Sequence, residues 1–566
     1  MMWTKSRGNA PSAMHPTSIL LEKDCSFAQS ATKRYESVTN LSETRPTLSI
    51  SLIETARSGA RALRALSRRM RTTRARAGLA ALALAAAFIV PGALPARAAD
   101  EDAPAASPLA RPTQTAGETP PVGNLEQTIP GFLQSAYGPP SFGPPYGTTH
   151  AFGDWGGVQP WLQNHGIYAA LALYEGISGN VAGGKRQSYT LAGQVGATVD
   201  IDWQKLLGAG AWSEDLWLHT LAVNGNGQNL SRLFGDNGNQ VQQIYGARGN
   251  VVAHLVWAYF EKSWLHHKVD LAVGWIPTGT FFNNSPWVCS FMNVWLCGNV
   301  TPTKYLASGR DWPSGNIGTV LRLMPTRHFY VMGGLFAVSP HSYNGGISGW
   351  AWGQDNLGKL GTEVEVGWLP EFGPDHLIGH YKVGVLYDNS RYDNLYADGN
   401  GQPWIVTGLP PRRQSGQTSV WVLADQMLVR HGPGESNGLV LAGQYSYADG
   451  KTSQMNHHLV AALLDTGYLW GRPLDSVGIN FQWANFSRSA IQSQEAAAAY
   501  GVPFRGANFG TPYGIQGHES IYEAFYSVHV MTGVSLQPDF QYVNHVGGTT
   551  VFKDAVVLST ALNVLF

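Results

Sequence analysis

Apolar and polar side chains alternate with a period of two over roughly four hundred residues of this chain, the pattern of consecutive β-strands. In the segment 554–566, Leu558 and Leu562 fall on one face, and Ser559 and Asn563 fall on the other. Such alternation predicts either a sheet with one face on a dry core, or a barrel with lipid outside and water inside.

The polar members of the pattern distinguish these two folds. They are mostly Gln, Asn, Thr, Asp and Gly, whereas the solvated face of a soluble sandwich is rich in Lys and Glu. Only 13% of the residues are charged, about half the usual share of a soluble protein. Beyond position 100 no run of about 20 apolar residues occurs, which excludes a bundle of membrane helices. A closed barrel is the remaining way to satisfy every backbone polar group in lipid.

The predicted fold class is all-β: a transmembrane, antiparallel, up-and-down barrel of about 16 strands, after a short helical or irregular segment near 155–165. Sixteen is an even number and large enough for an aqueous pore. The long connections 277–314, 389–417 and 487–518 are expected outside the cell, because periplasmic turns are short. The predicted strands are 167–176, 189–203, 215–224, 250–262, 268–276, 315–325, 328–338, 360–369, 377–388, 418–430, 437–448, 456–467, 474–486, 519–531, 533–543 and 554–566.

Aromatic residues near the predicted strand ends suggest a girdle at the two membrane interfaces. Each of them is individually as compatible with ordinary packing. The set is Trp203, Trp257, Trp264, Trp368, Trp421, Trp470 and Tyr542.

The N-terminal part has the layout of an export signal. Five arginines between positions 68 and 76 precede the apolar run 79–94, which ends at a small-residue site before Ala99. We therefore expect residues 1–69 to be an untranslated extension, with Met70 as the true start, and 70–98 to be a signal peptide. Residues 99–150 are rich in Pro, Ala, Ser and Gly and predict a periplasmic linker, which leaves 151–566 for the barrel.

Charge and cysteine content fit this division. The first 98 residues hold 15 of the 38 Lys and Arg but 5 of the 38 Asp and Glu, so the remainder has an excess of about ten acidic residues. This acidity argues against nucleic acid as a partner. The exported part keeps Cys289 and Cys297, for which a disulfide, two free thiols and a metal pair are all conceivable.

Several stretches resemble the carbohydrate-selective porin (OprB) family. They are Gly153–Gly157 at the start of the barrel, the cysteine-bracketed Pro286–Gly298, and Leu536–Tyr542, Asp554–Leu558 and Phe566 at the end. The resemblance implies a sixteen-stranded barrel with loops folded into the lumen, facilitated diffusion of small sugars, and a C-terminal signal read by the outer-membrane assembly machinery. It implies residence in the outer membrane, in contact with its lipid, and a homotrimer is a possible oligomer.

In one respect the chain departs from the family. Members usually place Arg after the glycine that ends the fifth strand, where this chain has Trp275, and a second basic position corresponds to Gln228. A sugar channel needs aromatic faces and hydrogen-bonding groups. Packing of the aromatics between loop and wall is the equally weighted alternative. The candidate constriction comprises Gln228, Trp275, Thr280, Asn283, Asn284, Trp287, Trp295, Arg310, Asp311 and Trp312, and Glu363, Glu365, Glu523 and Asp539 are expected on the lumen face.

No enzyme, cofactor or metal site is predicted. The chain lacks the usual nucleophile-elbow, zinc-protease and phosphate-loop motifs. The rival hypotheses are an outer-membrane hydrolase, for which Ser527 and His529 on one strand are the best candidates, and a plugged barrel that binds glycans at the surface.

Overall fold

The computed structural model describes residues 150–566, except 209, 211, 243–252, 286, 297–300, 312, 339–348, 351–358, 433–436, 468–470 and 506–509. The predicted leader and most of the linker therefore lie outside the described residues. No helix in the described part is both long and apolar enough to cross a membrane.

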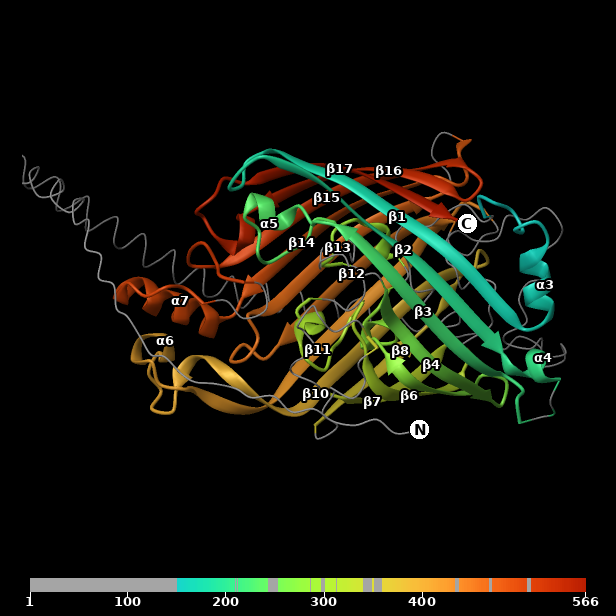
Figure 1. Ribbon diagram of the computed structural model, residues 1–566, viewed down its shortest axis with the longest axis horizontal. Coiled ribbons are helices and arrows are strands. Elements are labelled where there is room, and N and C mark those ends of the chain that lie inside the picture. The colour runs from blue at the N-terminus through green and yellow to red at the C-terminus, as the bar shows by residue number, and fades with distance from the viewer. Residues whose placement is uncertain are drawn as a thin grey trace, which may run out of the picture. The chain divides into compact units, whose positions relative to one another are not determined.

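Antiparallel strands form one closed barrel, in which each strand pairs with its neighbours in sequence and β17 returns to β1 (Figure 1). The sheet has seventeen strands in the described residues, of which β9 is a two-residue piece in the turn before β10. The remaining sixteen confirm the predicted fold. Their bounds are β1 (Ile167–Ala182), β2 (Ser188–Asp202), β3 (Leu216–Gly227), β4 (His254–Trp264), β5 (Val269–Ile276), β6 (Asn316–Thr326), β7 (Phe329–Ala337), β8 (Leu360–Trp368), β9 (Glu371–Phe372), β10 (Leu377–Asp398), β11 (Pro411–Arg430), β12 (Gly438–Ala448), β13 (Met455–Thr466), β14 (Ser476–Phe486), β15 (His518–Met531), β16 (Val534–Asn544) and β17 (Ala555–Leu565).

Short helices lie at the strand ends. The expected N-terminal turn is α3, and α7 is capped by the Ser487 hydroxyl, which accepts from the backbone N–H of Ala490. The helices are α3 (Val158–Asn164), α4 (Trp203–Leu207), α5 (Ser231–Phe234), α6 (Trp404–Thr407) and α7 (Arg488–Tyr500), with single 3₁₀ turns η2 (Thr278–Thr280), η3 (Val288–Ser290), η4 (Thr303–Tyr305) and η7 (Val546–Gly548).

Burial follows the predicted alternation. In β17, Leu558 and Leu562 are exposed on the outer face, whereas Ser559 and Asn563 are buried on the inner face. The other strands repeat this pattern, so the outer wall is apolar and the inner wall carries most of the polar side chains. A lipid-facing surface and a polar interior are what the period of two predicts.

Two sequence expectations need correction. The segment 389–417 is not a loop throughout, because β10 continues to Asp398 and β11 begins at Pro411, with a register shift near Asp388 that lets the hairpin extend. Trp257 and Trp421 do not belong to an outer girdle, because they occupy inward positions and are each 1% exposed. Trp264, in contrast, is 43% exposed on β4, as a girdle residue should be. Trp470 lies outside the described residues.

Candidate functional site

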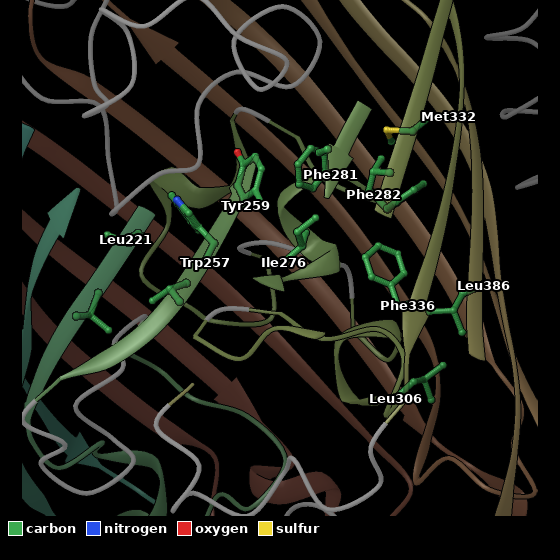
Figure 2. Close-up of a cluster of buried hydrophobic side chains, with 14 of the residues drawn as sticks. Leu221, Trp257, Tyr259, Ile276, Phe281, Phe282, Leu306, Met332, Phe336 and Leu386 are labelled. Atoms are coloured by element: carbon green, nitrogen blue, oxygen red, sulfur yellow. The ribbon is translucent and has the colours of Figure 1, made fainter. Parts of the chain in front are cut away.

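The connection between β5 and β6, which we call the inner loop (277–315), folds into the barrel, as the family resemblance implies for such loops. Nearly all of its described residues are buried. Figure 2 shows Phe281, Phe282 and Leu306 of this loop beside side chains from the walls of β4, β7 and β10. Phe282 lies edge-on to Phe336 of β7, with ring centroids 6.2 Å apart. Apolar packing therefore fixes the first part of the loop against the wall.

Glu365 on β8 holds the backbone of the inner loop. Its carboxylate accepts from the backbone N–H of Asn283 at 2.8 Å, and also from Trp421 Nε1 at 2.7 Å and Tyr330 Oη at 2.8 Å. Asn283 has a left-handed backbone with a φ of 54°, a conformation that asparagine tolerates better than most residues. Three donors converge on one buried carboxylate, an arrangement that stabilises both the charge and the loop.

Asp425 on β11 forms the second attachment. It accepts from the Ser285 hydroxyl at 3.0 Å and from Trp287 Nε1 at 3.1 Å, and His380 Nδ1 lies 2.5 Å from it. Beside it, Lys382 donates to the carbonyl of Asn284 at 2.7 Å. An acid and a base on neighbouring strands thus bind consecutive loop residues.

Glu523 on β15 forms the third attachment, on another part of the wall. Its carboxylate accepts from the backbone N–H groups of Met292 at 2.6 Å and Asn293 at 3.0 Å, and from Asn480 Nδ2 at 2.7 Å. The Asn293 side chain donates in turn to Gln541 at 3.0 Å. Because β8 and β15 are far apart in the strand order, the inner loop spans the bore.

A second segment, residues 228–242, lies beside the inner loop within the barrel. Trp295 Nε1 donates to the carbonyl of Gly238 at 2.9 Å, and the Val294 N–H donates to the carbonyl of Gln240 at 2.9 Å. An apolar cluster surrounds Trp295. Its buried members include Leu230, Phe234, Val241, Met455, Phe486, Ile521, Val543 and Val546.

The three predicted tryptophans within the described residues do not offer stacking faces to a solute. Trp275, Trp287 and Trp295 are 3%, 8% and 0% exposed, and so act as packing between the loop and its surroundings. For these three side chains the burial favours the packing alternative over sugar stacking. Trp312 and Cys297 lie outside the described residues, so the disulfide from the buried Cys289 stays a prediction.

The other predicted residues divide into two groups. Thr280, Asn283 and Asn284 are buried in the inner loop, as is Arg310, whose carbonyl accepts from the N–H of Gly279 at 3.1 Å. Asp311 is paired with Lys304 at 3.6 Å, and its side chain keeps 14% exposure. Gln228 is separate from these residues. It is exposed at the end of β3, where its N–H donates to Leu191 at 3.1 Å.

Sequence reasoning placed Glu365 and Glu523 on the inner face but missed Asp425, Lys382 and Trp421. The same alternation of inward and outward positions could have identified them. Asp425 and Lys382 occupy inward positions, between lipid-facing residues such as Val383. Their role in holding a loop has no sequence signal, because it depends on a contact more than 90 residues away.

The hydrolase candidates are not assembled into a relay. Asp475, the residue before β14, accepts a hydrogen bond from the backbone N–H of His529 at 2.9 Å, not from its imidazole. Asp475 also accepts from Arg472 Nε and Tyr526 Oη, each at 2.5 Å. Burial raises the pKa of this carboxyl, but the Arg472 hydrogen bond and the others outweigh it and hold the pKa below its usual value. Within the described part of the chain, no cluster of His, Cys, Asp and Glu could hold a metal ion.

Comparison with known proteins gives a consistent result. Residues 186–566 match the family model described as carbohydrate-selective porin, OprB family. The chain is 25% identical over 422 residues to Porin B of Pseudomonas aeruginosa, covering 73% of this chain and 90% of that protein. It is 26% identical over 432 residues to the putative porin QuiX of Acinetobacter baylyi, covering 73% and 92%. The high-pH structure of Pseudomonas putida OprB matches with a TM-score of 0.65 and 24% identity, covering 74% of this chain and 98% of that one, which supports the fold.

Proposed function

Because the chain belongs to the carbohydrate-selective porin (OprB) family and is an outer-membrane carbohydrate porin, we propose that its inner loop forms the narrow, solute-selecting part of the pore. The observation that carries this proposal is the attachment of one loop to Glu365, Asp425 and Glu523. A loop that is attached to the inner wall at three places crosses the bore and narrows it. The hydrolase and plugged-barrel hypotheses have no support, since the homologues are channels.

Within the inner loop we assign direct contact with the solute to Asp311. Among the inner-loop candidates that the structure describes, its side chain keeps the most exposure, 14%, and its carboxylate can accept from sugar hydroxyl groups. Asn283, Asn284 and Arg310 are buried and maintain the shape of the loop. Exposed polar groups bind a sugar weakly enough for release, which conduction requires.

Swelling of liposomes that contain the purified porin tests this assignment. With the wild-type protein we expect glucose to enter faster than an amino acid of similar size, and a disaccharide to enter more slowly than glucose. Asp311→Ala should reduce the difference between glucose and the amino acid by about threefold, the value of one weak hydrogen bond. Asp393→Ala, an exposed aspartate on β10 outside the loop, is the control and should keep the wild-type ratios. If the wild-type porin passed all solutes of equal size at equal rates, the assignment of solute contact to Asp311 would be wrong.

The C-terminal residue is proposed to be the signal for the outer-membrane assembly machinery. Phe566 donates its N–H to the carbonyl of Leu171 at 2.9 Å, and its ring lies 5.1 Å from that of Phe152, so the terminus also closes β17 onto β1. Deletion of Phe566 should lower the amount of heat-modifiable barrel in the outer membrane by about tenfold, since one lost aromatic contact and one lost backbone hydrogen bond together weaken closure. Phe566→Tyr should assemble normally. Normal assembly of the deletion would contradict the proposal.

The remaining proposals concern parts outside the described residues or outside a single chain. They are the signal peptide at 70–98, the periplasmic linker at 99–150, the Cys289–Cys297 disulfide and a homotrimer. N-terminal sequencing of the mature protein tests the signal peptide and shows whether the linker is retained. Thiol titration tests the disulfide, and cross-linking in native membranes tests the homotrimer.

A further inference from the structure

Four basic side chains gather at one end of the barrel, opposite the end that holds Phe566. We call them the basic rim: Lys185 and Arg186 in the turn between β1 and β2, Arg232 on α5, and Lys553 before β17. All four are exposed. Backbone hydrogen bonds connect the three segments: the Lys185 N–H donates to Phe234 at 2.6 Å, and the Gly184 N–H donates to Lys553 at 2.9 Å. In Figure 1, α5 lies next to the β1–β2 turn.

The basic rim has no acidic partner of its own in the described residues. None of its four cations takes part in a salt bridge there. The nearby Asp554 accepts from Tyr542 Oη at 2.7 Å, Asn544 Nδ2 at 2.9 Å and the His545 N–H at 3.0 Å. These contacts direct its carboxylate toward β16. The rim therefore carries an excess of positive charge over the adjacent Asp554.

The outer wall below the rim changes character in an order that fits a membrane surface. Ile177, Leu191 and Leu558 face outward and are 58%, 48% and 48% exposed, as lipid-facing side chains should be. Closer to the rim stands Tyr189, 85% exposed, at the level where an aromatic girdle meets the headgroups. Beyond Tyr189 lies Lys185 in the β1–β2 turn, with its Nζ 4.5 Å from the centre of the Tyr513 ring.

We propose that the basic rim binds the phosphate groups of anionic lipid in the outer leaflet of the outer membrane. The end that holds Phe566 carries two-residue turns, between β6 and β7 and between β15 and β16. The short turns of such a barrel face the periplasm, which places the rim, at the opposite end, at the cell surface. Lysine and arginine bind phosphate through charge-assisted hydrogen bonds, and clusters of this size next to an apolar surface are typical of anionic-lipid recognition. Lys185 and Arg186 follow directly on the ends of β1 and β2, next to their outward-facing apolar side chains. This arrangement fits a headgroup attached to acyl chains better than a free anion.

Binding of lipid A to the purified full-length porin in neutral detergent tests the proposal. The probes are lipid A with its phosphate groups, the same lipid after enzymatic dephosphorylation, and inorganic phosphate. The variant K185Q/R186Q/R232Q/K553Q removes the rim. The control K205Q/K262Q/K268Q removes three lysines near the opposite end, two of which also lie over aromatic rings. Heat-modified mobility on gels confirms that every variant is folded.

We expect the wild-type porin and the control to bind phosphorylated lipid A at least tenfold more tightly than the dephosphorylated lipid, and the rim variant to lose that preference. Equal binding by wild type and rim variant would overturn the proposal. So would displacement of the lipid by millimolar inorganic phosphate, which would indicate a free-anion site. A rim variant that changes its oligomeric state while binding lipid normally would assign this face to a second copy of the chain.

Discussion

Replacing Glu365 and Glu523 together by glutamine will increase single-channel conductance and allow larger sugars to pass. Each carboxylate accepts three hydrogen bonds, and between them three of these come from the backbone of the inner loop. A glutamine amide carries no charge, so the charge-assisted hydrogen bonds to the loop become weaker neutral ones, and in Glu523→Gln its NH2 group faces the Nδ2 donor of Asn480. A hydrogen bond to a charged group contributes about 1.5–3 kcal/mol, so the double change should shift the loop toward released conformations by at least tenfold.

Planar-bilayer recordings and liposome swelling with a series of oligosaccharides provide the measurement. E365Q and E523Q alone should each show part of the effect, with more current noise as the loop moves in and out of place. Glu261→Gln is the matched control, because this buried inner-wall glutamate faces His219 at 3.5 Å instead of the inner loop. A double variant with the wild-type conductance and size limit would mean that other contacts hold the loop.

The barrel itself was predictable because its determinants are local. Each strand needs only its own alternating pattern, and lipid outside requires an apolar face whatever the neighbouring strand contains. The predictions were wrong where a side chain faces the interior of the barrel and its contacts there determine its role. Trp421 looks like a girdle residue by type and position, but its inward parity brings its indole N–H to Glu365. The place of Trp421 in the alternating pattern indicates its inward orientation correctly, whereas its residue type does not.

The site was less predictable, because it depends on pairs that are distant in sequence. The inner loop is rich in tryptophan and asparagine, which is compatible with sugar stacking and with packing alike. The wall decides between these possibilities, since Asp425 takes the indole N–H of Trp287 and an apolar cluster encloses Trp295. Glu365 and Glu523 were expected on the lumen face. In the structure, Glu365 and Glu523 are instead occupied by the loop.

Removing Arg322 will destabilise the barrel more than removing both members of its ion pair. Arg322 on β6 contacts Asp270 on β5 through Nη2 at 2.6 Å and Nε at 3.1 Å, and both side chains are 0% exposed. Ser263 donates to the same carboxylate at 2.5 Å. In R322M the Asp270 charge stays buried without its guanidinium, which should cost about 3–5 kcal/mol of unfolding free energy.

Replacing both partners with apolar side chains leaves no buried charge to compensate. R322M/D270L should therefore recover most of the loss, because an apolar pair of similar volume avoids the desolvation cost that an ion pair must offset. Urea unfolding of the porin in lipid vesicles, followed by tryptophan fluorescence, gives the free energies. R413M, which breaks the exposed Arg413–Asp393 pair, should leave stability unchanged within error. If the single and double variants at 322 and 270 lost equal stability, the loss would come from packing around Arg322, and the buried charge of Asp270 would not be its cause.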